Sequence, residues 1–259
     1  MAQVIAIINH KGGTGKTTTT VNLGAALAQK NRRVLLIDLD PQASLTYHLG
    51  VKGPSFNMAN ALLKEAKLID ILHEREGMKI ATANASLSDI ELTISHLSNR
   101  EAFLSNALQD LLPYYDYVLI DCPPAISILT INALTAANKV IIPVKLEMMS
   151  LEGVRLVKDT IEKVKGAFNP GLAIIGVLPV MYSKGGSLLF GKSKAQKEND
   201  NVLKVLKSEI QIPVFKSTIS ADVVAMKAPS EGKSILKFAP KSNLTKEYKA
   251  FADEFLRQN

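Results

Sequence analysis

Short runs of aliphatic and β-branched residues recur along the chain, and most of them end at a carboxylate, a glycine or a proline. Runs of this length and composition are typical of strands that are buried on both faces of a sheet. Strands are predicted at Val4–Ile8, Val34–Ile37, Lys79–Ala83, Tyr117–Ile120, Val140–Ile142, Ala173–Leu178 and, as a short piece, Val214–Phe215.

The segments between these runs favour helices. Helices are predicted at Thr17–Gln29, Arg100–Leu112, Ser150–Phe168, Ser193–Ile210 and Leu244–Leu256, and residues 41–76 look helical without a clear apolar face. Pro113 closes the second helix, and Ser150 is expected to cap the third. Strands that alternate with helices predict an α/β fold, with a mostly parallel twisted sheet and helices on both faces. With no long linker or repeat, residues 1–259 are expected to form a single domain.

Composition supports this fold and narrows the classes of function. Aliphatic, aromatic and cysteine residues make up 47% of the 259 residues, and aromatic residues only 5%, which suits helices packed on a parallel sheet. The single cysteine, Cys122, excludes a disulfide framework and indicates a reducing, cytoplasmic setting. We expect neither a signal peptide nor a membrane span, because no apolar run reaches about 18 residues.

A glycine-rich segment joins the first predicted strand to the first predicted helix. Gly12, Gly13 and Gly15 let the backbone approach phosphate oxygens and direct several N–H groups at them. Lys16 supplies a mobile ammonium group for the β- and γ-phosphates, and the Thr17 hydroxyl can bind Mg²⁺. The segment therefore predicts a P-loop that binds ATP and Mg²⁺. The general pattern has glycine where this chain has His10, and Lys11 follows at once.

Carboxylates stand at the ends of two predicted strands. Asp38 and Asp40 follow the second strand, and Asp121 follows the strand at Tyr117–Ile120. The carboxyl ends of parallel strands meet at one edge of a sheet, where ligands bind. A catalytic or metal-binding role is one interpretation; for Asp38 and Asp40 the other is a turn or helix cap beside Pro41.

Four segments together resemble the ParA/MinD family of ATPases with a deviant Walker A motif. The first, Lys11–Thr18, resembles the deviant phosphate loop itself. Leu35–Gln42 and Tyr117–Pro124 are similar to the second box and to the Walker B strand with its switch. Ala228–Lys233 is similar to a late ParA segment near the nucleotide base. The matches run in order over most of the chain.

This resemblance implies a role for each matched residue. Lys11 would reach across an ATP-dependent homodimer to the partner's phosphates, Lys16 would hold phosphates in its own subunit, and Asp40 would position the attacking water. Thr17, Asp38 and Asp121 would support Mg²⁺, directly or through water. The implied nucleotide-binding residues are Lys11, Gly12, Gly13, Thr14, Gly15, Lys16, Thr17, Thr18, Met181 and Pro229. A nucleotide site that a second subunit completes implies slow ATP hydrolysis, which an adaptor or centromere-binding protein would stimulate.

Positive charge is concentrated in the last third of the chain. Residues 1–183 hold 17 Lys and Arg against 16 Asp and Glu, whereas residues 184–249 hold 13 Lys against 6 acids. Such a cluster is typical of a protein that binds a polyanion, although a solvated basic surface fits as well. ParA-like relatives bind double-stranded DNA without sequence preference, so the region 184–241 is the candidate. The candidate phosphate contacts are Lys184, Lys192, Lys194, Lys197, Lys204 and Lys207.

The sequence departs from the family at some of these positions. ParA proteins often carry arginines near Ser183–Gly186 and at the positions of Ala221 and Val224, so any DNA surface here would be built from lysines. Lys145 stands where glutamine is frequent, and it could pair with Glu147 or lie near a dimer interface.

The main functional hypothesis is a nucleoid-associated ParA-type protein that positions a plasmid, a chromosome or a protein assembly. Two other functions remain as alternatives. A MinD-like protein would bind membranes, but the stripe of Tyr248, Phe251 and Phe255 carries a nearly neutral opposite face and favours a core contact. A metabolic P-loop kinase or ligase would have no need of Lys11. Relatives of the nitrogenase iron protein are excluded, since each subunit would need two cysteines.

Overall fold

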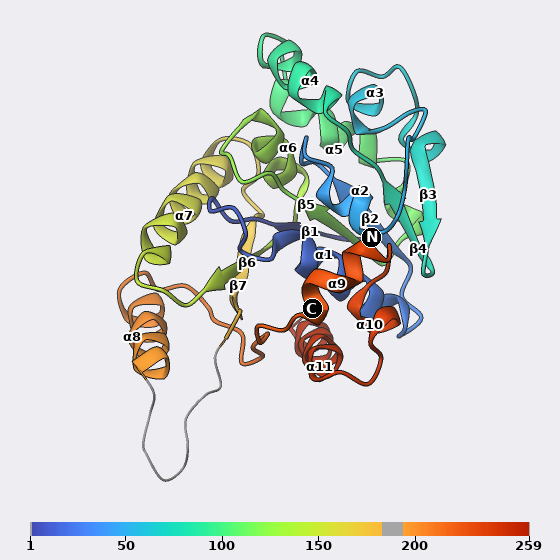
Figure 1. The fold of residues 1–259 in the computed structure, drawn as a ribbon. Coiled ribbons are helices and arrows are strands. Elements are labelled where there is room, and N and C mark those ends of the chain that lie inside the picture. Colours follow the sequence, from blue (N-terminus) through green and yellow to red (C-terminus); the bar gives the residue numbers. More distant parts are fainter. Residues whose placement is uncertain (1, 183–193, 259) are drawn as a thin grey trace.

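A computed structural model describes residues 2–182 and 194–258 and shows one twisted sheet with helices on both faces (Figure 1). Within the described residues the sheet has seven strands in the order β3-β4-β2-β5-β1-β6-β7. All neighbouring strands are parallel except β3, which runs antiparallel to β4 at one edge. The strands are β1 Gln3–Ile7, β2 Val34–Asp38, β3 Leu72–Arg75, β4 Met78–Ala81, β5 Tyr117–Asp121, β6 Lys139–Lys145 and β7 Ala173–Val180.

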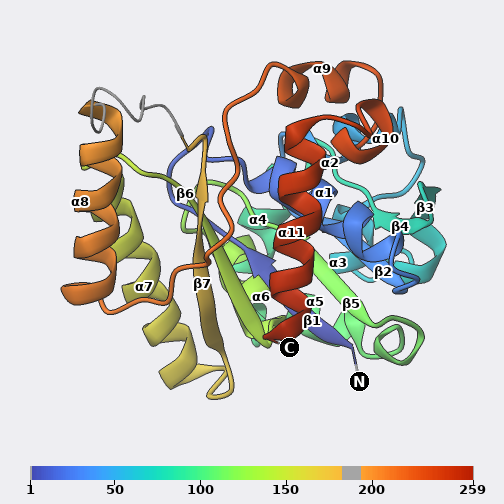
Figure 2. The ribbon, with the colours of Figure 1, turned by 90° about the horizontal axis from the view of Figure 1, so that it is seen from below.

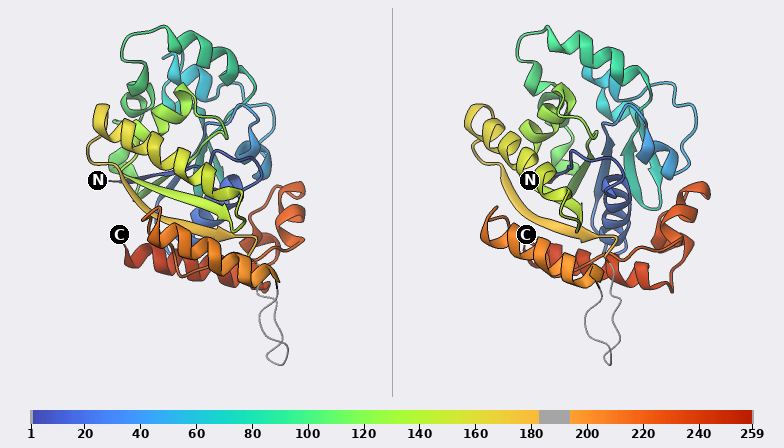
Figure 3. Two further views of the ribbon diagram at one scale, coloured as in Figure 1. Left: turned by 90° about the vertical axis from the view of Figure 1, so that its left-hand side faces the viewer. Right: turned by 60° about the vertical axis from the view of Figure 1, so that its left-hand side comes forward.

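The helices fall into two layers, one on each face of the sheet (Figures 2 and 3). One layer holds α1 Lys16–Ala28, α2 Ser44–His48, α9 Val224–Ser230, α10 Ile235–Phe238 and α11 Asn243–Arg257. The other holds α3 Met58–Leu62, α4 Ser86–Ser95, α5 Phe103–Leu108, α6 Ile128–Ala136 and α7 Ser150–Ala167, and α8 Lys194–Ser208 packs against α7. Helices on both faces of a largely parallel sheet confirm the predicted α/β class.

Alternation along the strands divides the core into two apolar clusters. Ile5 and Ile7 of β1 belong to the cluster shared with α1 and α11, whereas Val4 and Ala6 belong to the cluster on the opposite face. Consecutive side chains of a strand point to opposite faces, so a strand must be apolar throughout to fill both. This requirement is why the strands could be recognised as continuous apolar runs.

The carboxyl ends of three central strands lie level with one another. In the parallel register Ile7 pairs with Asp121, and Asp38 also pairs with Asp121. The loop after β1 therefore begins at the same edge of the sheet as the two strand-terminal carboxylates, as the sequence predicts. α1 starts from that loop, so its amino terminus faces the same edge.

Four sequence predictions are wrong in detail. Residues 41–76 are not one helical region: they hold two short helices, a 3₁₀ turn and the edge strand β3. The predicted helix Arg100–Leu112 is divided into the 3₁₀ turn Arg100–Ala102, α5 and the 3₁₀ turn Leu112–Tyr114. The side chain of Asn132 binds the backbone at the junction of the first turn and α5. It donates to the Arg100 carbonyl (2.7 Å) and accepts from the Leu104 N–H (3.0 Å).

The third wrong prediction concerns Ser150, which is the first residue of α7 rather than its cap; Met149 occupies the cap position. The predicted strand Val214–Phe215 amounts to one bridge between Val214 and Val177. The apolar stripe of α11 is a core contact, as expected: Tyr248, Phe251 and Phe255 are buried, and α11 packs on α1.

Gly24 marks the point where α1 lies closest to the sheet. An added methyl group would meet Leu36 Cδ2 at 2.7 Å and Met78 Sδ at 3.0 Å. We expect Gly24→Ala to cost about 1–3 kcal/mol from overpacking, reduced by about 1 kcal/mol of gained helix propensity. In α7, Gly166 has nothing within 4 Å of an added methyl, so Gly166→Ala should stabilise the fold by about 0.5–1 kcal/mol. Urea unfolding measures both, and equal effects would contradict the close contact at Gly24.

Candidate nucleotide-binding site

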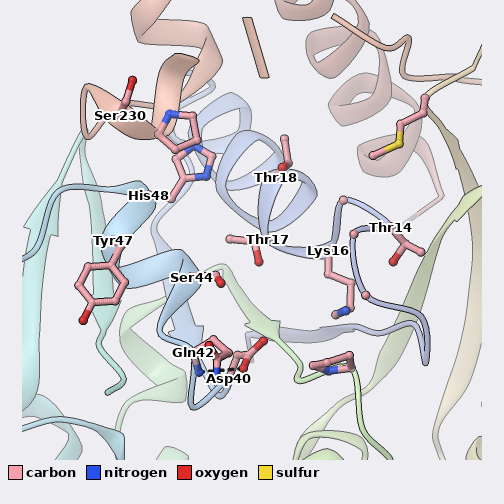
Figure 4. Close-up of a pocket in the computed structure, with 16 residues that line it drawn as sticks. Thr14, Lys16, Thr17, Thr18, Asp40, Gln42, Ser44, Tyr47, His48 and Ser230 are labelled. Atoms are coloured by element: carbon pink, nitrogen blue, oxygen red, sulfur yellow. Dashed lines mark hydrogen bonds between the residues drawn. The ribbon is translucent and has the colours of Figure 1, made fainter. Parts of the chain in front are cut away.

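An open pocket of ≈ 700 Å³ lies at the carboxyl edge of the sheet. Figure 4 shows Lys16 and Thr17 on one wall and the segment that carries Asp40 on the other. The lining residues come from the loop after β1 with the start of α1, from the segment after β2 with α2, from the loops after β5 and β7, and from α9. They are Gly12, Gly13, Thr14, Gly15, Lys16, Thr17, Thr18, Asp40, Gln42, Ser44, Tyr47, His48, Pro124, Met181, Pro229 and Ser230.

The glycine-rich loop has the conformation that a phosphate cradle needs. Gly13 and Gly15 have φ angles of 70° and 74°, which side chains disfavour, and Gly15 caps α1. The Thr14 hydroxyl donates to the Lys11 carbonyl (3.1 Å) and closes the loop. Lys16 is only 7% exposed and lies at the first turn of α1. The helix dipole, the backbone N–H groups and the Lys16 ammonium thus act together on an anion in this cradle.

Asp121 is a buried carboxylate without a hydrogen-bond partner among the described residues. Burial, and next the charge of Asp38, raise the pKa of Asp121 well above its usual range, while the Thr17 hydroxyl and the Lys16 ammonium oppose the shift. A bound cation would relieve the same cost of burial. The orphaned carboxylate beside the Thr17 hydroxyl therefore fits Mg²⁺, which binds proteins through few groups and keeps water and phosphate ligands.

Asp38 and Asp40 have different surroundings although only one residue separates them. Asp38 is fully buried; one oxygen accepts from the backbone (2.8 Å) and hydroxyl (2.7 Å) of Thr46, and the other from the Asp40 N–H (3.2 Å). Burial raises the pKa of Asp38 to about 6. Asp38 thus holds α2 in place, so any contribution to a metal would be indirect. Asp40 lines the pocket and accepts from the Gln42 N–H (2.9 Å).

Lys11 does not line this pocket. Its ammonium lies 3.7 Å from Glu147, the side chain is 48% exposed, and Glu147 also pairs with Lys145. Asn9 fixes the backbone here, because its side chain donates to the Pro143 carbonyl (2.6 Å) and accepts from the Lys11 N–H (3.0 Å). Lys11 is therefore held at the rim, beside the end of β6, with its ammonium near Glu147 rather than among the groups that line the pocket of its own chain.

The segment that carries Pro229 and Ser230 is anchored to three other elements. The Ser234 N–H and hydroxyl donate to Glu76 in the β3–β4 turn, and the Asn22 side chain of α1 accepts from the Ile235 N–H (2.7 Å). Gly50 and Gly232 approach so closely that a Cβ on Gly232 would lie 3.0 Å from the Gly50 Cα. Met181, which the family resemblance implies as a nucleotide-binding residue, lines the same pocket.

Several lining residues carry no signal that the sequence analysis detected. Ser44, Tyr47 and His48 lie on α2, which the contacts of Asp38 with Thr46 bring beside the phosphate loop. His48 is 4% exposed, and burial lowers its pKa to about 4, so the ring is neutral at pH 7. The only clue in the sequence was their position directly after the Asp38–Gln42 segment.

The predicted DNA-binding lysines are only partly within the described residues. Lys184 and Lys192 lie outside the described residues. Lys194 is the first residue of α8, and only its backbone is described. Lys197, Lys204 and Lys207 are exposed. Their spacing of seven and three residues places them on one side of α8, opposite the buried Val202 and Leu206.

A glycine-rich loop between a strand and a helix, with Lys16 and Thr17 at its end and carboxylates at neighbouring strand ends, defines a P-loop nucleotide-binding protein. Residues 2–174 match a family model described as an AAA domain. The chain belongs to the ParA/MinD family of P-loop ATPases, as its relatives show.

Two relatives and one solved structure illustrate the match. The chain is 37% identical to the sporulation initiation inhibitor protein Soj of Bacillus subtilis, covering 98% of both chains. It is also 37% identical to the chromosome partitioning protein ParA of Caulobacter vibrioides, covering 98% of this chain and 94% of that one. The structure is that of cobyrinic acid a,c-diamide synthase from Mycobacterium smegmatis with bound ATP analog and magnesium. It superposes with a TM-score of 0.85 at 34% identity over 99% of this chain and 95% of that chain.

Proposed function

We propose that this chain is a ParA-type ATPase that binds ATP and Mg²⁺, associates into a homodimer on ATP and binds double-stranded DNA without sequence preference. Hydrolysis is slow and is stimulated by an adaptor or centromere-binding protein. The cargo is a plasmid, a chromosome or a large protein assembly, and the protein is cytoplasmic and associated with the nucleoid. The relatives named as a chromosome partitioning protein and as Soj support this proposal.

The position of Lys11 is the observation that carries the proposal. A P-loop lysine that served its own nucleotide would face its own pocket, as Lys16 does. Lys11 instead lies at the rim, and Met148 and Met149 nearby are 52% and 83% exposed. A cation and exposed apolar side chains at the mouth of a nucleotide site suit contact with a second subunit, where Lys11 would meet the partner's phosphates.

The lysines of α8 support DNA as the polyanion. Lys197, Lys204 and Lys207 form an exposed row, without aromatic residues that could stack on bases. Such a row suits charge contacts with the phosphate backbone rather than base readout. α9 and α10 belong to the layer around α1 and α2, whereas α8 packs on α7, so within the described residues 196–241 the lysines lie in two separate parts of the molecule.

A membrane-surface protein would need a helix with a free apolar face, and the candidate helix, α11, does not have one. Surface-binding helices insert a free apolar face, but the apolar face of α11 is buried on α1 and β-strand residues. Within the part of the chain that the structure describes, no helix combines the length and the apolar character needed to cross a bilayer. Sedimentation with liposomes and ATP distinguishes the two hypotheses.

A small-molecule ligase or kinase is the other class to test, since one similar structure is named as a synthase. Such an enzyme would complete its site within one chain, and Lys11 would then have no role in catalysis. Loss of hydrolysis in Lys11→Ala, with ATP binding intact, supports the dimeric ATPase; unchanged activity would favour the ligase class.

The DNA-binding test compares two triple variants of equal charge. In Lys197→Gln/Lys204→Gln/Lys207→Gln we expect ATP-dependent DNA affinity to fall and the slope of log K against log salt to shrink by up to about 3, since each phosphate contact contributes about 0.9. Lys52→Gln/Lys64→Gln/Lys67→Gln removes three exposed lysines from the segments before and after α3, which lies on the opposite side of the molecule from α8 (Figure 1), and should bind DNA as the parent does. Fluorescence anisotropy at several salt concentrations measures both. Equal DNA affinity in ATP and ADP would contradict the proposal that ATP controls DNA binding.

A further inference from the structure

Glu147 carries two cations at once. One carboxylate oxygen pairs with the ammonium of Lys145, and the other lies 3.7 Å from the ammonium of Lys11. The three side chains are partly exposed, at 48% for Lys11, 35% for Glu147 and 47% for Lys145. One carboxylate is therefore shared by Lys11, which the proposed dimer requires, and by Lys145, to which the proposed function assigns no role.

The backbone holds this arrangement together. Lys145 is the last residue of β6, and the Glu147 N–H donates to its carbonyl oxygen (2.8 Å), so the chain turns tightly between them. Asn9 joins the start of the phosphate loop to the same strand through Pro143. One anchor is a backbone contact and the other is made by the Asn9 side chain, and neither involves the charged groups of Lys11 or Lys145. The choice left open is which lysine Glu147 holds more closely.

Lys145 has the closer contact. The pKa of Glu147 lies below its usual value, and the hydrogen bond from Lys145 is the largest cause, with Lys11 contributing less. Lys145 weakens the hold on Lys11 in two ways: its contact with one oxygen neutralises part of the charge of the shared carboxylate, and its positive charge repels the ammonium of Lys11. Both effects have the same sign, and both are modest because the groups are exposed to solvent.

We propose that Lys145 is a positioning residue that competes with Lys11 for Glu147 and so sets how readily Lys11 leaves its own subunit to complete the partner's nucleotide site. The inference rests on the proposed ATP-dependent dimer and adds a residue that regulates how readily the dimer forms. A resting subunit holds Lys11 on Glu147, and Lys145 keeps that hold weak. The ATP concentration at which subunits associate then depends on a residue that need not touch nucleotide.

Two measurements test this competition. The first is the rate at which an amine-reactive ester labels Lys11 without nucleotide, followed by mass spectrometry. The second is the ATP concentration that gives half-maximal dimer, followed by analytical ultracentrifugation. In Lys145→Gln we expect labelling of Lys11 to slow by about twofold to fivefold and the ATP midpoint to rise by a similar factor, the range that exposed ion pairs provide. Both effects should shrink in high salt.

Matched variants separate competition from a general structural role. Lys145→Arg keeps the charge and should behave as the parent protein. Glu147→Gln releases both lysines, so Lys11 should label faster, and adding Lys145→Gln to it should change nothing further. A second effect of Lys145→Gln in the Glu147→Gln background would show that Lys145 acts by another route and would overturn the inference.

The outcomes distinguish this inference from the proposed function. If ATP fails to dimerise the parent protein, the proposed function is wrong and the regulatory part of the inference is wrong with it. If ATP dimerises the parent but Lys145→Gln has the same midpoint and the same labelling of Lys11, only the inference is wrong.

Discussion

Replacing Lys16 with alanine is expected to lower the affinity for ATP by about 100-fold or more, because two charge-assisted hydrogen bonds of about 1.5–3 kcal/mol each are lost. Lys16 is buried in the cradle at the start of α1, so bulk solvent cannot replace its ammonium. The loss also removes the cation that opposes the raised pKa of Asp121. Isothermal titration calorimetry with a slowly hydrolysed ATP analogue measures the change.

Lys11→Ala is the matched control for this prediction. It removes the same kind of side chain five positions earlier, from a residue at the rim that does not line the pocket. Binding of ATP by one subunit should stay within about twofold of the parent, since an exposed ion pair contributes at most about 1 kcal/mol. Dimerisation and hydrolysis should both be lost. An equal loss of ATP binding in the two variants would show that Lys11 serves its own pocket.

Replacing Asp40 with alanine is expected to leave ATP binding and the dimer intact but to slow hydrolysis by about 100-fold or more, the usual contribution of a general base. Asp40 lines the pocket opposite Lys16 and Thr17 (Figure 4), where it can accept a proton from, or orient, a water. The variant should therefore accumulate as an ATP-bound dimer on DNA. Phosphate release under single-turnover conditions, with dimer content measured in parallel, tests both parts.

Asp40→Asn separates charge from structure. Its amide oxygen can still accept from the Gln42 N–H, so the turn after β2 is kept while the carboxylate is lost. Slow hydrolysis in both variants indicates that the charge matters. Normal hydrolysis in either variant would contradict the role of Asp40 in positioning water.

The parallel part of the sheet could be predicted because its strands must fill two apolar layers. Tyr117–Ile120 and Val34–Ile37 are continuous apolar runs for that reason, and both are strands. The edge strand β3 has no such requirement: Leu72–Arg75 is only partly buried and mixes charged with apolar residues. α6 escaped prediction for the opposite reason, since Ile128–Ala136 is apolar on nearly every side and shows no helical period.

The residues of the candidate site also fall into two groups, those that the sequence could predict and those that it could not. Residues with a fixed spacing, from Lys11 to Thr18, could be found because phosphate binding constrains neighbours in the chain. Ser44, Tyr47 and His48 reach the same pocket only through packing of α2, held by Asp38 and Thr46. The Lys145–Glu147 pair was one of two possibilities that the sequence left open, whereas the third member, Lys11, depends on Asn9 holding the loop against β6.

The anchoring of the segment around Pro229 has a consequence for the timing of nucleotide exchange. Glu76, Asn22 and the Gly50–Gly232 contact hold that wall of the pocket through contacts within the chain. Since little chain remains to be ordered, ATP should enter at a rate limited by diffusion and orientation rather than by folding of the wall. Exchange of ADP for ATP would then be brief compared with the other stages of the cycle. In the proposed dimer, separation of the two subunits would then set the lifetime of each state, so the slow step of the cycle would lie between subunits rather than within one.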